Sequence, residues 1–299
     1  MNTAFLASVI VLCVGVFWGV YWVPVRAIAA LGLDGAWGTG AITLAAMLFL
    51  LPFVAGKTHL FRDTGLVGVV SIALGGTAFA LYSIGFLYGK VALVVLLWFF
   101  SPVWSVLIAK FVLRWQVPTL RLIAIGVGLA GLFVMLGGEG SVPVPRGLGE
   151  WMAFIGGLIW AGATAGMRLK SRVPPLPAAF VFALGATSLA FSPFLEPLPA
   201  IAGEDAVWVG ITVLATGGIW WGLSIAALMW AALRLDPARV GILLMPEVIF
   251  GAVTAAMFAG ETLSAREMVG GGMVIVCGLL EVWPTKPNAR HPQVAKNAP

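Results

Sequence analysis

Glu247 is the side chain in this sequence that is best placed to do chemistry. It is the sole charged residue between Arg239 and Glu261, within a long apolar stretch. A carboxylate inside a lipid-spanning helix costs roughly 3 kcal/mol or more, so it must face a cavity, be protonated or find a partner. Two roles follow from this. Glu247 takes up a proton or a cationic group, or it bonds to a neighbouring helix as a structural residue.

Among the prolines inside apolar stretches, Pro102 and Pro246 form a matched pair, and Pro246 directly precedes Glu247. Pro102 lacks the N–H that would bond the carbonyl of Trp98, and Pro246 likewise frees the carbonyl of Ile242. Each freed carbonyl needs a neighbouring helix, a water or a ligand as its partner. A packing kink alone is the alternative for each proline. A matched pair of kinks favours a binding site.

The elements that carry these residues are apolar segments of membrane-spanning length. Only 10% of the chain is charged and 61% is apolar, whereas soluble domains carry roughly a quarter charged residues. Runs of about 20 apolar residues cross the ~30 Å hydrocarbon core, and lipid forces each of them to be helical. The sequence therefore predicts an all-α integral membrane protein with ten transmembrane helices. These spans centre on Thr3–Val25, Ala36–Ala55, Leu66–Leu87, Val91–Ala109, Leu122–Gly137, Trp151–Met167, Pro177–Leu195, Ala206–Leu233, Val240–Ala259 and Met268–Leu280.

The distribution of lysine and arginine predicts the orientation of these spans. Short loops rich in these residues stay in the cytoplasm. With the N-terminus inside, 13 of the 17 basic residues lie in inner loops or the tail. The four on the outside are Arg26, Lys90, Arg146 and Arg266. We therefore expect both termini in the cytoplasm, a first helix that is retained rather than cleaved, and no nucleic-acid partner.

The second half of the sequence repeats the first. Phe17–Gly19 aligns with Ile159–Ala161 at an offset of 142, and Gly75-Gly76 aligns with Gly217-Gly218 at the same offset. Pro102 aligns with Pro246 at an offset of 144. Five spans per half is an odd number, so the two halves must cross the membrane in opposite senses. This predicts two inverted five-helix repeats, residues 1–145 and 146–284, followed by a polar cytoplasmic tail at 285–299.

Three segments resemble a known family. They are Leu97–Trp104, Trp151–Trp160 and the Gly260–Leu263 turn before the last span. With ten spans in two fives, they resemble the drug/metabolite transporter superfamily, EamA type. The sixth span is similar to that of aromatic amino acid exporters of the YddG type. The family's glutamate-containing turn is absent from the first half, where Val117 takes the place that matches Glu261.

The resemblance implies a central cavity built from the third, fourth, eighth and ninth spans, with help from the first and sixth. Aromatic faces in such a cavity suit aromatic side chains and cations. Ordinary interfacial or lipid-facing aromatics are the alternative. The candidate substrate-binding residues are Tyr82, Trp98, Phe99, Ser101, Pro102, Trp160, Trp220, Trp221, Ser224, Pro246 and Glu247. The candidate hinges, small enough for close packing and bending, are Gly75, Gly76, Gly217 and Gly218.

These features predict a secondary transporter of the bacterial cell inner membrane that works by alternating access. It is expected to be a monomer that exports small hydrophobic metabolites, with aromatic and other neutral amino acids as substrates and protons as a further partner. An exporter of cationic drugs and a channel-like facilitator without coupling are the alternatives. No enzyme is expected, because His59 lies in a loop and His291 in the tail. Neither a cofactor nor a metal is expected, because Cys13 and Cys277 have no further ligands nearby.

Overall fold

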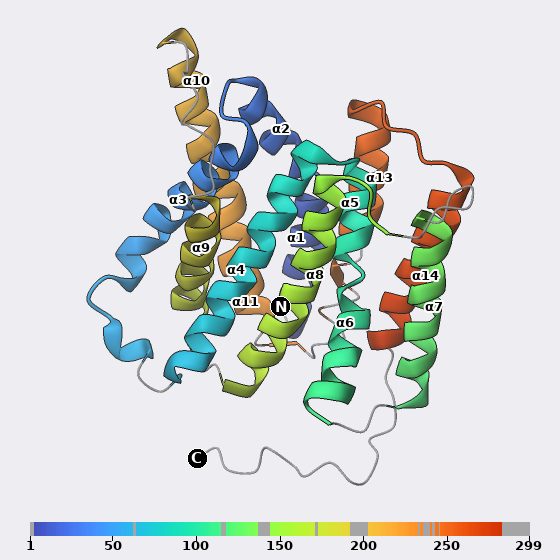
Figure 1. The fold of residues 1–299 in the computed structure, drawn as a ribbon. Helices are drawn as coiled ribbons and strands as arrows, with labels where there is room; N and C mark the ends of the chain where they lie inside the picture. The colour runs from blue at the N-terminus through green and yellow to red at the C-terminus, as the bar shows by residue number, and fades with distance from the viewer. Residues whose placement is uncertain are drawn as a thin grey trace.

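The computed structural model describes most of the chain as a bundle of helices (Figure 1). The residues described are 3–61, 64–114, 118–136, 144–170, 173–191, 203–232, 234–235, 240, 243–244 and 246–282. Within these residues there is no strand. The predicted tail at 285–299 and the carbonyl of Ile242 lie outside them, as does Val117.

Each of the ten predicted apolar segments carries helix. The helices are α1 (Thr3–Gly19), α2 (Trp22–Ala30), α3 (Gly35–Val54), α4 (Gly65–Tyr88), α5 (Val91–Trp98), α6 (Ser101–Leu107), α7 (Thr119–Leu136), α8 (Leu148–Lys170), α9 (Pro175–Ala190), α10 (Gly203–Leu214), α11 (Leu223–Ala232), α13 (Pro246–Phe258) and α14 (Ala265–Val282). A 3₁₀ turn, η1 (Thr58–Phe61), and two π-helical turns, η2 (Ile108–Val112) and η3 (Ala215–Gly222), complete the described elements.

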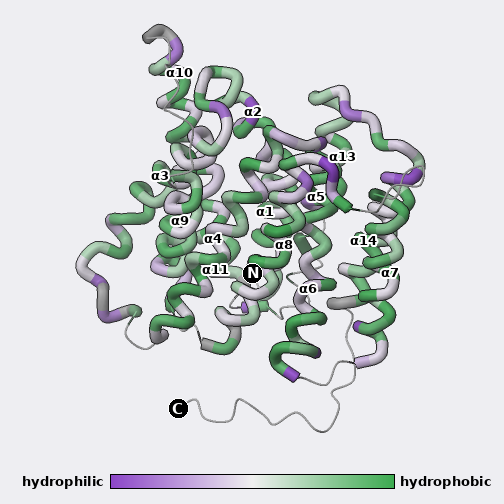
Figure 2. The backbone as a smooth tube through the Cα atoms, viewed as in Figure 1, coloured by the Kyte–Doolittle hydropathy of each residue, from purple (hydrophilic) through white to green (hydrophobic). Residues whose placement is uncertain are grey.

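The outer surface of the bundle is apolar. Six of the described helical stretches are long and apolar enough to cross a membrane, and α9 and α13 are shorter apolar helices. Large side chains such as Leu66, Phe133 and Ile219 are 80%, 63% and 67% exposed. Figure 2 shows hydrophobic residues along the helices and hydrophilic ones mostly at their ends and connections. The prediction of a helical membrane protein is confirmed at this level.

Three of the apolar stretches are interrupted. The fourth breaks between α5 and α6, where Pro102 predicts a break. The first breaks between α1 and α2, which the sequence analysis did not anticipate. Pro24 lies in the first turn of α2 and has no N–H to continue the ladder from α1. In the eighth, the π-helical turn η3 separates α10 from α11. π-Helical turns widen a helix locally and are frequent at functional sites.

α4 organises the packing of the bundle. It packs along α8 and α9, while α7 and α14 pack on each other at one edge of the molecule (Figure 1). α4 and α8 run in opposite directions, since Ser71 lies beside Gly166 and Gly85 beside Gly149. The first span, α1 followed by α2, runs in the same direction as α4, because Trp18 in α1 contacts Phe79 and Arg26 in α2 bonds the carbonyl of Gly89. α1 and α8 therefore run in opposite directions.

Glycines allow α4 and the helices around it to approach closely. A Cβ on Gly76 would meet the main chain of Phe182 in α9, and one on Gly185 would meet the main chain of Ala73 in α4. Across the bundle, a Cβ on Gly217 in η3 would meet the carbonyl of Ile42 in α3. In membrane bundles, such close backbone contacts drive helix association, since lipid offers no hydrophobic driving force between helices.

Gly76→Ala is expected to destabilise the bundle, because α4 and α9 would have to separate to make room for a methyl group. Overpacking of this kind costs about 1–3 kcal/mol. Thermal unfolding in detergent measures the effect. Gly126→Ala is the matched control, because no atom lies within 4 Å of a Cβ at that position in α7. Equal unfolding temperatures for the two variants would contradict the packing described.

Candidate functional site

Glu247 lies in the first turn of α13 and is buried, with 2% of its surface exposed. Its Oε1 accepts a hydrogen bond of 2.9 Å from the hydroxyl of Tyr82 in α4. The ring of Tyr82 stacks on Trp98 in α5, with ring centroids 4.7 Å apart and an interplanar angle of 22°. The carboxylate, the phenol and the indole thus join three helices that are far apart in sequence.

A closed circuit of aromatic rings surrounds this contact. Each ring touches the next, from Phe79 to Tyr82, Trp98, Trp160 and Phe182, and Phe182 returns to Phe79. The centroid separations run from 4.7 to 6.3 Å, which is the range of favourable aromatic pairs. The five rings come from α4, α5, α8 and α9. We call these five residues the aromatic circuit.

Trp221 closes one side of the aromatic circuit. It is fully buried, and its ring lies 5.3 Å from that of Phe79 and 5.8 Å from that of Phe182. Its indole N–H has no hydrogen-bond partner among the described residues. A buried donor without a partner costs about 1–3 kcal/mol. Trp221 therefore holds a donor ready for a ligand atom that accepts a hydrogen bond.

Trp220 and Ser224 lie elsewhere, on a cleft against α1. The ring of Trp220 packs edge-on against Phe17, and its indole N–H donates to the Phe17 carbonyl at 3.2 Å. Ser224 accepts a 3.0 Å hydrogen bond from the indole N–H of Trp18. Of the two adjacent tryptophans, only Trp221 joins the rings around Tyr82.

The remaining predicted residues lie at the break between α5 and α6 in the fourth span and at the start of α13 in the ninth. Phe99 lies between α5 and α6, and Ser101 and Pro102 open α6; all three are half-buried. The N–H of Phe100 bonds the carbonyl of Leu97, three residues earlier, rather than the carbonyl four residues earlier. The regular α-helical hydrogen-bond pattern is therefore broken there. Pro246 lies at the start of α13 as described, and Ile242, whose carbonyl it was predicted to free, lies outside the described residues.

Two glycines at equivalent positions of the two halves face the main chain beside Pro102 and Pro246. A Cβ on Gly157 in α8 would lie 3.1 Å from the carbonyl oxygen of Trp98. A Cβ on Gly15 in α1 would lie 3.2 Å from the carbonyl oxygen of Leu244. Gly15 and Gly157 are 142 residues apart, the offset of the internal repeat. Each glycine faces the main chain within five residues before a proline.

The four hinge candidates differ in their surroundings. Gly76 and Gly217 lie at close backbone contacts with α9 and α3. Gly75 faces the ring of Phe182, and a Cβ on Gly75 would lie 3.0 Å from that ring. Gly218 is more open, since the nearest atom belongs to the Phe49 side chain at 3.7 Å. All four lie at helix interfaces of α4 or η3, and whether they act as hinges stays a prediction.

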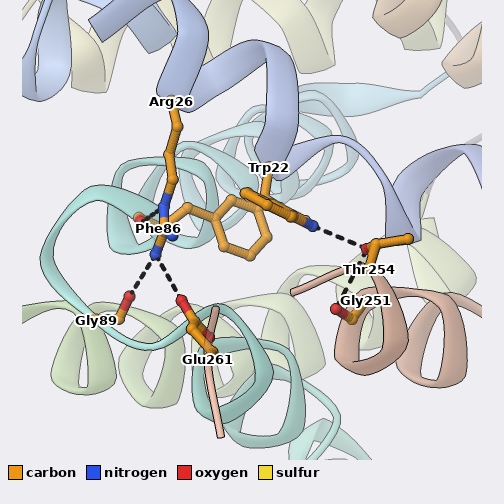
Figure 3. Close-up of polar contacts among 7 residues, drawn as sticks. All are labelled: Trp22, Arg26, Phe86, Gly89, Gly251, Thr254 and Glu261. Carbon is orange, nitrogen blue, oxygen red and sulfur yellow. Dashed lines mark hydrogen bonds and ion pairs between the residues drawn. The ribbon is translucent and has the colours of Figure 1, made fainter. Parts of the chain in front are cut away.

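A second polar cluster closes one end of the bundle (Figure 3). The guanidinium of Arg26 donates to the carbonyls of Phe86 and Gly89 and forms a 2.9 Å ion pair with Glu261. Four residues earlier, the indole N–H of Trp22 donates to the hydroxyl of Thr254 at 3.0 Å. Together these bonds tie α2 to the end of α4 and to α13. We call Trp22, Arg26, Thr254 and Glu261 the end clamp.

The end clamp is reinforced at the start of α14. Ser264 and Glu267 form a reciprocal capping pair, since the backbone N–H of each bonds the side chain of the other. Lys90, which follows α4, forms a 3.3 Å ion pair with Glu267. The connection between α13 and α14 is thus held to the connection between α4 and α5.

Sequence reasoning missed Phe79, Phe182 and the partners in the end clamp. Phe79 precedes Tyr82 by three residues, so the two share one helix face. This spacing was a usable signal. The pairing of Arg26 with Glu261 joins positions 235 residues apart, and no local pattern reveals it.

The comparisons with known proteins support a fold and no function. The sequence matches no protein-family model, and no curated protein matches it. A solved structure described only as "Crystal structure of protein" is similar in fold, with a TM-score of 0.58 and 17% sequence identity. The match covers 92% of this chain and 96% of that one. The arrangement of helices is therefore shared with an experimentally determined protein over nearly the whole chain.

The site presents groups that suit the binding of a ligand. The described residues contain no group of three His, Cys, Asp or Glu side chains that could hold a metal. The aromatic circuit offers ring faces and edges, Glu247 offers a carboxylate, and Trp221 offers an N–H donor. The structure holds Tyr82, Trp98 and Glu247 in mutual contact at 1%, 6% and 2% exposure, so a ligand reaches them only after helices separate.

Tyr82→Phe is expected to destabilise the protein by about 1–3 kcal/mol, because Glu247 stays buried and loses its hydrogen-bond donor. Tyr21→Phe is the matched control. Tyr21 is equally buried, but its hydroxyl lies a long 3.4 Å from that of Ser83. Thermal unfolding in detergent compares the two. If adding Glu247→Gln to Tyr82→Phe restores none of the loss, the hydrogen bond does not have the role assigned to it.

Proposed function

We propose that this protein is a secondary transporter of the drug/metabolite transporter superfamily, EamA type. Its ten helices form two inverted five-helix repeats, residues 1–145 and 146–284. It exports small hydrophobic metabolites, with aromatic and other neutral amino acids as substrates, across the bacterial inner membrane by alternating access. The family assignment rests on the sequence resemblance of Leu97–Trp104, Trp151–Trp160 and Gly260–Leu263.

The observation that carries the proposal is the paired packing of Gly15 and Gly157. Each glycine lies in the first span of its half and faces the main chain just before the proline of the other half's fourth span. An exchange of the two halves carries Gly15 onto Gly157, and the two contacts then differ by two residues along the partner span, because Leu244 corresponds to Phe100 rather than to Trp98. Repeats of this kind build transporters whose binding sites lie at interrupted helices near the membrane midplane.

Further contacts support the same exchange. α4 packs on α9, so the third span contacts the seventh. In the same way, η3 packs on α3, so the eighth span contacts the second. α5 packs on α8 as α13 packs on α1. The opposite directions of α1 and α8, the first span of each half, are those an inverted repeat requires. A structural scaffold would have no need of such symmetry, whereas a carrier uses it to exchange two conformations.

The aromatic circuit supports the choice of substrate. Its rings suit an aromatic or branched side chain, because edge and face contacts between rings are each worth about 0.5–1.5 kcal/mol beyond burial. The free indole N–H of Trp221 suits a substrate carboxylate, and Glu247 suits a substrate ammonium group or a proton. A lipophilic cation would use the ring faces and Glu247, but not the N–H donor.

The end clamp has a place in this cycle. With both termini in the cytoplasm, Arg26 and Glu261 lie at the outer end. Their ion pair and the Trp22–Thr254 hydrogen bond then hold the outer end closed, and opening requires both to break. The clamp draws on both halves, since Trp22 and Arg26 belong to the first and Thr254 and Glu261 to the second.

Counterflow in proteoliposomes tests the proposed function. Vesicles loaded with unlabelled phenylalanine should take up radiolabelled phenylalanine or tryptophan with saturation. Trp98→Ala should reduce the rate at least tenfold, because it removes the ring that stacks on Tyr82. Glu247→Gln should alter the rate and flatten its dependence on pH. Glu150→Gln is the matched control, because Glu150 lies at the start of α8 and outside the aromatic circuit.

The competing functions predict different outcomes in the same assay. A channel-like facilitator shows flux without saturation or counterflow. A drug exporter transports tetraphenylphosphonium and leaves phenylalanine untouched. An unchanged transport rate and pH dependence in Glu247→Gln would contradict the role proposed for the carboxylate. Whether the protein is a carrier is decided separately, by the presence or absence of counterflow.

A further inference from the structure

A lateral cleft opens between α1 and the α10–η3–α11 stretch, apart from the aromatic circuit. It has a volume of about 710 Å³. Its rim is exposed, with Ile219 at 67%, Leu223 at 56% and Phe17 at 50%. Its inner wall includes the buried residues Val14 and Ser224. The cleft therefore faces outward from the bundle rather than into its centre.

The cleft offers almost nothing to water or to a polar ligand. Its lining is aliphatic and aromatic apart from Cys13, two threonines and Ser224. The indole N–H of Trp220 is bonded to the Phe17 carbonyl, and Ser224 is bonded to Trp18 and to the carbonyl of Trp221. Water in a cavity needs two to four polar partners. An apolar occupant is required instead.

The cleft is continuous with the surface that meets the lipid. Its rim residues belong to the same exposed apolar faces that indicate membrane embedding. Its lining runs from Val9 to Phe17 in α1, which is about 12 Å at ~1.5 Å rise per residue, and continues to Pro24 in α2. One leaflet supplies about half of a ~30 Å hydrocarbon core. The cleft is thus long enough to take an extended hydrocarbon chain over the depth of a leaflet.

We propose that this cleft is a binding site for one acyl chain of a membrane lipid, seated between α1 and η3. The chain fills the space left where η3 widens the helix and where Ala215 and Ala227 present small side chains. Its inner end rests against Ser224, whose bond from Trp18 separates the cleft from the ring of Phe79. The site depends on membrane embedding and stands whether or not the protein transports.

A photoreactive phospholipid with a diazirine in its acyl chain tests the site. The full-length protein is reconstituted in vesicles that contain this lipid, illuminated, digested and analysed by mass spectrometry. We expect adducts on the cleft segments 9–17 and 211–224 to exceed, several-fold, those on α7, where Leu129 and Phe133 are 50% and 63% exposed. Equal adducts on both faces would overturn the proposal.

Filling the cleft gives the second measurement. Ala215→Phe should reduce the cleft adducts to the level of α7, and the matched Ala130→Phe on the exposed face of α7 should leave them unchanged. Cys13 is exposed and lines the cleft, while Cys277 is buried, so a bulky maleimide fills the cleft of the folded protein. Cys13→Ser is its control. If the lipid adducts in the cleft persist both in Ala215→Phe and after maleimide modification of Cys13, no acyl chain is bound in the cleft.

Discussion

The burial of one carboxylate in a lipid-embedded bundle constrains the rest of the structure. Glu247 has 2% of its surface exposed and accepts a hydrogen bond from Tyr82. An unpaired charge at that depth would be costly, so the phenol must stay within reach. Stacking on Trp98 fixes the phenol, and Trp98 is held in turn by Trp160 and by the main chain beside Gly157. Movement of any one of α4, α5, α8 or α13 therefore disturbs the carboxylate.

Close backbone contacts at glycine are what bring these helices together. Gly76 and Gly185 bring α4 against α9, and Gly217 brings η3 against α3. Because lipid gives helices no hydrophobic reason to associate, such contacts carry much of the packing energy. The fourth and eighth spans are interrupted, at Phe99–Phe100 and at η3, so close backbone packing and broken helices occur in the same bundle. In the transport cycle proposed above, such a bundle exchanges two arrangements of its helices, and the end clamp holds one of them.

The sequence predicted the apolar segments and the break at Pro102 because both follow from local chemistry. Lipid demands helix, and proline removes a ladder hydrogen bond. The break after Gly19 was missed because the proline that causes it, Pro24, lies several residues later, in the first turn of α2. Trp220 and Trp221 were both placed in one cavity, although adjacent residues point to different faces of a helix, and the apolar sequence on both sides of η3 does not indicate which face is inward. Phe182 and the Arg26–Glu261 pair depend on tertiary packing, which no periodicity encodes.

Alternating access is the central claim, and distances between spin labels at the two ends of the bundle test it most directly. In a Cys13→Ser background, one pair replaces Lys90 and Arg266 beside the end clamp, and the other replaces Lys110 and Arg234 at the proposed inner end. Each of these four residues is exposed. Pulsed electron resonance with and without phenylalanine should show the two distances changing in opposite directions. Distances that stay fixed, or that lengthen together, would contradict the account.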